Sequence, residues 1–113
     1  RLLADAKVRA LAMVEGYQAP EPIELNLPGA TARVAMEMAV NDFRAMGKAT
    51  PHDVVVSTQL ARVLSGGDTD MVDKVSEDQL LQLERTAFMN LLRNNNTLAR
   101  METMLETGKP LRN

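Results

Sequence analysis

The sequence has 113 residues, of which 45% are hydrophobic and 25% are charged, and its net charge is −2. This length predicts a single domain, and the acidic excess argues against a protein that grips nucleic-acid backbones, which needs a surplus of basic side chains. The absence of cysteine excludes disulfide scaffolds and thiolate metal sites, and no apolar run approaches the ~20 residues of a membrane-spanning helix.

The first 16 residues predict an amphipathic helix that ends at Gly16. Its apolar positions recur at helical spacing: Leu3, Ala6, Ala10 and Val14, widened by Leu2, Leu11 and Met13. Residues 17–28 contain three of the five prolines and predict a linker. Ile23, Leu25 and Leu27 alternate with polar residues there, so a short extended segment is expected.

Residues 30–46 predict a second helix, with Val34, Met38 and Phe43 near one face and Gly47 at its end. A third helix is expected over residues 51–65, because Thr50 is a good N-cap and Pro51 suits the first helical position. The β-branched run at residues 54–56 would also suit a strand. The start signal and the later leucine and valine spacing favour the helix.

Residues 68–75 predict an acidic loop, and a fourth helix follows from Ser76, which forms a capping-box pattern with Gln79. The three asparagines at 94–96 interrupt the periodicity, which resumes at Thr97 and ends at Gly108. The sequence therefore predicts an all-α fold, a compact bundle of about four to five short helices. We expect residues 1–28 to form a helix and linker after a missing upstream domain, and residues 29–113 to form a C-terminal helical domain.

No set of residues predicts a catalytic or metal site. The only histidine, His52, has no cysteine or histidine partner, and its position in a first helical turn favours a solvated or capping side chain. The acidic residues of the 68–75 loop do not have the spacing of a calcium-binding loop, which favours a solvated loop. Met101 and Met104 could form a groove for an acyl chain or a helix, although their spacing favours filling of the core.

Four stretches carry a family resemblance: "KATPHDVVV", "VLSGGDTD", "LERTAF" and "MLETGKPLRN". The region from about residue 47 to residue 113 resembles the C-terminal helical region of bacterial bifunctional 3-hydroxyacyl-CoA dehydrogenase/enoyl-CoA hydratase proteins of fatty-acid β-oxidation. The first helix resembles the one that follows the hydratase core, and the tail is similar to that of crotonase-type hydratases. The resemblance implies a cytoplasmic parent enzyme with oxidoreductase and lyase activities that uses NAD and acyl-CoA.

This resemblance implies that the chain holds no catalytic residues or cofactor of its own, since no "GxGxxG" dinucleotide motif occurs in it. Its expected partners are the hydratase and dehydrogenase domains, together with other subunits of a homo-oligomer. The basic tail of crotonase-type enzymes can lie near CoA phosphates, which makes Lys109 the first and Arg112 the second candidate for such a contact. Lys109 would equally complement the dipole at a helix end.

Two other classes of function remain open. The chain could be an independent helical interaction or dimerisation domain, which would expose a large apolar patch. A small DNA-binding protein with residues 50–64 as its recognition helix is the third reading, and the net charge of −2 argues against it.

Overall fold

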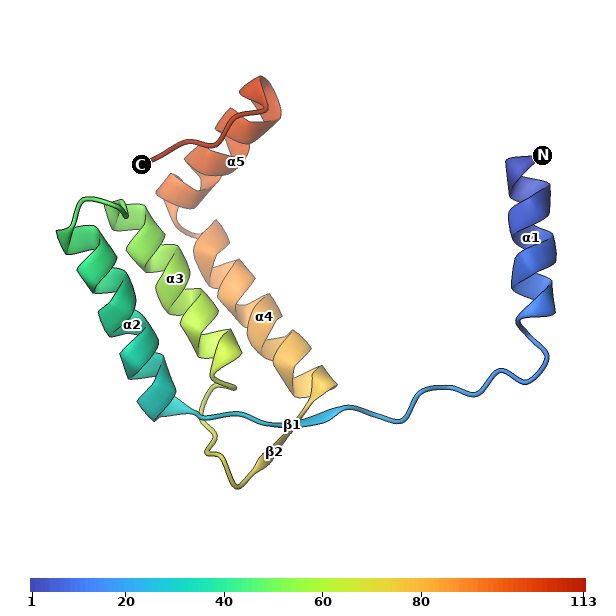
Figure 1. Ribbon diagram of the computed structural model, residues 1–113. Helices are drawn as coiled ribbons and strands as arrows, with labels where there is room; N and C mark the ends of the chain where they lie inside the picture. Colours follow the sequence, from blue (N-terminus) through green and yellow to red (C-terminus); the bar gives the residue numbers. More distant parts are fainter.

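The computed structural model describes all 113 residues and contains five helices and one two-stranded sheet (Figure 1). The helices are α1 (Leu2–Ala12), α2 (Ala30–Ala45), α3 (Pro51–Leu64), α4 (Glu77–Leu92) and α5 (Asn95–Thr107), and the strands are β1 (Glu24–Asn26) and β2 (Lys74–Ser76). The prediction of an all-α fold is confirmed. None of the helices has both the length and the hydropathy that a membrane span requires.

Both predicted capping signals start helices. At α3, the Thr50 hydroxyl accepts a hydrogen bond from the backbone N–H of Asp53 (3.2 Å), and the Asp53 carboxylate accepts one from the Thr50 N–H (2.8 Å). Ser76 and Gln79 make the same reciprocal pair at α4. Each pair satisfies two N–H groups that a helix start leaves free. The start signal therefore prevails over the β-branched run at residues 54–56, which is helical.

The asparagine run holds a helix start. Asn94 is the N-cap of α5, and its side chain accepts a hydrogen bond from the N–H of Asn96 (2.9 Å). The expectation that the helix resumes only at Thr97 is thus wrong by two residues. An asparagine at the N-cap promotes a helix, whereas asparagines inside it disfavour one. The helix ends at Gly108, as predicted, and this glycine has a left-handed conformation.

Three of the helices form a single layer. α2, α3 and α4 run alternately up and down, and α2 and α4 lie on opposite sides of α3 (Figure 1). α5 turns away from the end of α4 after two residues, and α1 stands apart at the far end of the linker. Each helix of the layer therefore contacts its neighbours along its sides and leaves most of its other surface uncovered.

The linker joins the helical layer through the short sheet. β1 pairs antiparallel with β2, with Leu25 opposite Val75, so the expected extended segment is confirmed. The Asn26 side chain donates a hydrogen bond to the carbonyl oxygen of Met71 (3.0 Å) and fastens the acidic loop beneath the sheet. The sheet thus fixes the direction in which the linker leaves the helices.

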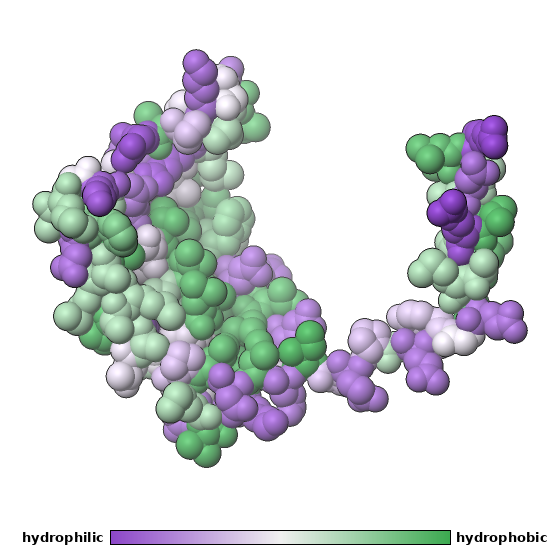
Figure 2. Space-filling view, viewed as in Figure 1, coloured by the Kyte–Doolittle hydropathy of each residue, from purple (hydrophilic) through white to green (hydrophobic).

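The core is very small for a chain of this length. Only eight residues are buried, and three of them are hydrophobic: Ala61, Val75 and Ala87. Leu3 is 86% exposed and Leu105 is 85% exposed, and apolar side chains gather on the viewed face of the helical layer and on α1 (Figure 2). The radius of gyration of 19.7 Å exceeds the about 13 Å of a globular chain of this length. One helical layer cannot enclose a core, because a core forms between two packed layers.

Candidate functional site

Polar side chains from distant segments meet at the N-terminal end of α3. Arg100 on α5 donates a hydrogen bond from Nη2 to the Asp53 carboxylate (2.9 Å) and another to the Thr50 hydroxyl (3.2 Å). Its Nε donates to Oδ1 of Asn113 (2.7 Å), whose own amide donates to the carbonyl oxygen of Asn96 (3.0 Å). We call this group of residues the Arg100 junction. It ties the start of α3, the body of α5 and the end of the chain together.

Asp53 is held as a carboxylate by the junction. The hydrogen bond from the Thr50 backbone, then the bonds from the Arg100 and Thr50 side chains, lower the pKa of Asp53 from 3.8 to about 2. These groups favour the charged form and outweigh the opposing effect of burial. The carboxylate therefore serves as a cap and an ion-pair partner, and a group of such low pKa is a poor general base at neutral pH.

His52 is a buried side chain, so the expectation of a solvated or capping residue is wrong. It is 2% exposed, and its Nε2 forms a hydrogen bond with the Thr97 hydroxyl (2.9 Å), while Nδ1 has no partner. Burial, and next the charge of Arg100, lower the pKa of His52 below 6.5, against a raising effect of Asp53. Its partner Thr97 lies 45 residues away in the sequence, so local pattern gave no signal of this contact.

The buried histidine makes folding sensitive to acid. In the unfolded chain His52 takes up a proton near its ordinary pKa of about 6.5, whereas in the folded chain its pKa is lower. The unfolded state therefore binds more protons, and the free energy of unfolding falls as the pH drops below about 6.5. The free energy of unfolding falls a second time, by about 1–2 kcal/mol after solvent screening, as the pH drops from 3.8 to about 2 and Asp53 takes up its proton. Urea titrations at a series of pH values measure both. In His52→Gln, the fall in the free energy of unfolding below about pH 6.5 should be smaller. An unchanged fall would contradict its assignment to His52.

The two predicted CoA-binding residues lie in the tail that returns along α5. Lys109 is exposed and forms no ion pair. Arg112 donates a hydrogen bond to the carbonyl oxygen of Lys48 (3.4 Å), between α2 and α3, and the chain end lies close to that turn (Figure 1). The structure therefore leaves the Lys109 ammonium accessible and engages Arg112 in part.

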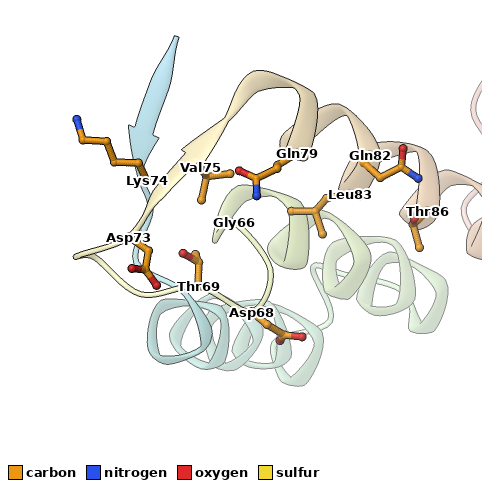
Figure 3. A pocket seen from close by; sticks show the side chains of 10 residues that line it. All are labelled: Gly66, Asp68, Thr69, Asp73, Lys74, Val75, Gln79, Gln82, Leu83 and Thr86. Atoms are coloured by element: carbon orange, nitrogen blue, oxygen red, sulfur yellow. The ribbon is translucent and has the colours of Figure 1, made fainter. Parts of the chain in front are cut away.

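The largest pocket, of about 570 Å³, lies between the acidic loop, β2 and α4 (Figure 3). Two of its polar groups already have structural roles. Gln79 belongs to the α4 cap, and the carboxylate oxygens of Asp68 lie 3.9 Å from guanidinium nitrogens of Arg33 and Arg62. The three aspartates of the loop are exposed, as expected. The structure contains no group of three or more His, Cys, Asp or Glu residues that could hold a metal ion.

Two apolar hollows open on the helical surface. One, of about 360 Å³, is lined by Arg100, Met101, Met104 and Leu105. Met101 is 41% and Met104 is 46% exposed, so the preference for core filling is wrong, and the two methionines line an open apolar hollow. The other, of about 350 Å³, is lined by six apolar residues of β1, α3 and α4 and the segment after β1, with two glutamates at its edge.

Comparison with known proteins gives one relative. No protein-family model matches the chain, and no solved structure matches it. A protein of Bacillus subtilis (strain 168) described as a probable 3-hydroxyacyl-CoA dehydrogenase is 35% identical over 113 residues. The match covers 99% of this chain and 14% of that protein, so the chain spans about one seventh of its relative's length. The expected resemblance is confirmed in this coarser form: the chain is similar to a segment of a 3-hydroxyacyl-CoA dehydrogenase.

Proposed function

We propose that the chain is a non-catalytic, C-terminal helical module of a fatty-acid β-oxidation enzyme of the 3-hydroxyacyl-CoA dehydrogenase/enoyl-CoA hydratase type. Its helical layer would pack on the hydratase part, or support acyl-CoA binding and oligomerisation. The observation that carries the proposal is the single helical layer with eight buried residues, because such a layer needs a second surface to complete a core. The match to one seventh of a longer dehydrogenase supports the identity of that parent.

The polar groups support a structural rather than a catalytic role. The Arg100 junction is partly buried and joins capping groups to the chain end, and Asp53 has a lowered pKa. NAD and the reacting part of acyl-CoA would then bind to other domains of the parent, and residues 1–28 would connect the layer to them.

Packing on the parent can be measured directly. The probe is the Bacillus subtilis relative without the segment that matches this chain, mixed with the chain in calorimetry and in amide hydrogen exchange. We expect binding, with protection appearing over the exposed apolar positions of α2, α4 and α5. If no heat and no new protection appear although both partners are folded, the packing proposal is wrong.

Lys109 is the stronger candidate for a CoA contact, because its ammonium is free and a point charge suits phosphate. In the complete parent enzyme carrying this segment, Lys109→Gln should raise KM for an acyl-CoA about fivefold, the effect of losing ~1 kcal/mol from an exposed ion pair. Steady-state kinetics at varied acyl-CoA measure this. Lys48→Gln, which also removes a basic side chain, is the matched control, and equal KM values for both variants would contradict the assignment.

An independent interaction or dimerisation domain is the second candidate. It is favoured by the same exposed apolar surface, which Figure 2 shows on the helical layer. One measurement separates the two candidates: a self-sufficient domain would gain no protection from the truncated relative.

A further inference from the structure

Helix α1 and one groove of the helical layer are matching apolar surfaces that lack partners. Every residue of α1 is exposed, and a helix of 11 residues is marginally stable in water without packing. Within α1 its apolar stripe consists of Leu3, Ala6 and Ala10 with Leu2 beside them, and Met13 and Val14 follow just past the end of the helix. A helix with this stripe requires an apolar surface about one helix wide.

The groove offers such a surface. Its volume is about 350 Å³, and its apolar lining comes from β1, the segment after it, α3 and α4: Leu25, Leu27, Val63, Leu64, Leu80 and Leu81. Leu64 is 55% and Leu81 is 52% exposed, so a helix laid across the groove would remove large side chains from water. Burying such side chains stabilises association, because apolar surface is removed from water.

The charges of the two surfaces are complementary. At 100° per residue, Arg9 borders the α1 stripe beside Leu2, and Lys7 lies between Leu3 and Leu11, so both charges lie close to whatever the stripe contacts. Glu77 and Glu84 line the groove, two turns apart on the same side of α4. Neither glutamate has a basic partner in this chain, and neither Lys7 nor Arg9 has an acidic one.

We propose that α1 of one copy packs into the Glu77/Glu84 groove of a second copy, and that the exchange is reciprocal. The β1–β2 pairing directs the linker out of the layer, Pro20 and Pro22 stiffen it, and α1 stands away from its own groove (Figure 1). The 11 residues between α1 and β1 span up to about 36 Å, enough to reach a neighbour. Exchange of an element through such a linker is a common route to two-fold dimers.

This inference rests on the self-association part of the proposed function, and its failure would leave packing on the parent untouched. The test uses the full chain with two charge-reversal variants, Lys7→Glu/Arg9→Glu and Glu77→Lys/Glu84→Lys. In each variant alone, α1 and groove carry like charges, so we expect the dimerisation Kd to rise at least about tenfold. In an equimolar mixture, each α1 meets an opposite groove on the other variant, and the dimer should return.

Sedimentation equilibrium of each variant and of the mixture measures the outcome. Glu102→Lys/Glu106→Lys is the matched control, since it reverses two exposed charges on α5, and it should dimerise as the original chain does. Far-ultraviolet circular dichroism confirms that each variant keeps its helices. A monomeric original chain, single variants that dimerise normally, or a mixture that stays monomeric would each overturn the proposal.

Discussion

Gly29→Ala should destabilise the chain by about 3 kcal/mol or more, because two costs combine at this residue. Gly29 has φ +70° and ψ −152°, a conformation that is essentially restricted to glycine. A Cβ atom there would overlap with the backbone carbonyl of Thr69. The Gly29 N–H also donates to the carbonyl oxygen of the fully buried Ser65 (2.8 Å), so any shift would separate the start of α2 from the end of α3.

Urea unfolding monitored by circular dichroism measures this effect, and Gly47→Ala is the matched control. Gly47 also has a positive φ (+72°), but a Cβ there would meet nothing within 4 Å, so the control should lose only about 1 kcal/mol. The difference between the variants isolates the overlap with Thr69. Equal losses would show that α2 and the acidic loop do not approach as closely as described.

Arg100→Met should lower the free energy of unfolding by about 2 kcal/mol and release the tail. Its guanidinium donates to Asp53, Thr50 and Asn113, and the Asp53–Arg100 pair is partly shielded from water. Hydrogen bonds to charged groups contribute about 1.5–3 kcal/mol each when their loss leaves a partner unsatisfied. Methionine keeps most of the side-chain length, so the change removes charge and donors rather than packing.

Two measurements separate this loss from a general weakening of α5. In Arg100→Met, the pKa of Asp53 should rise from about 2 toward 3.8, as followed by carboxylate NMR, and NMR relaxation should show a more mobile tail from Lys109 to Asn113. Arg93→Met is the control, since Arg93 makes one long local bond to Asn90 (3.4 Å). If the Asp53 pKa stays near 2, Arg100 does not hold that carboxylate.

Features that depend on a few neighbouring residues could be predicted from the sequence. The capping pairs at Thr50 and Ser76 set the starts of α3 and α4, and Gly108 sets the end of α5, because the hydrogen bonds involved join residues three or four apart. The alternation around Leu25 likewise indicated the extended segment that became β1.

Features that depend on distant partners could not be predicted. His52 is buried against Thr97 and Asp53 binds Arg100, across 45 and 47 residues respectively. The helical spacing of Met101 and Met104 indicates a shared face, but periodicity does not reveal whether another layer covers that face. Because α5 turns away from the helical layer (Figure 1), those methionines remain on the surface.

Turnover by the purified chain is the most direct test of the claim that its residues pack helices while the chemistry occurs elsewhere in a larger enzyme. The chain is incubated with crotonyl-CoA, and separately with 3-hydroxybutyryl-CoA and NAD, and product is followed by absorbance. The account predicts no turnover above the uncatalysed rate in either reaction. Hydration or NAD reduction that scales with the concentration of the chain would contradict it.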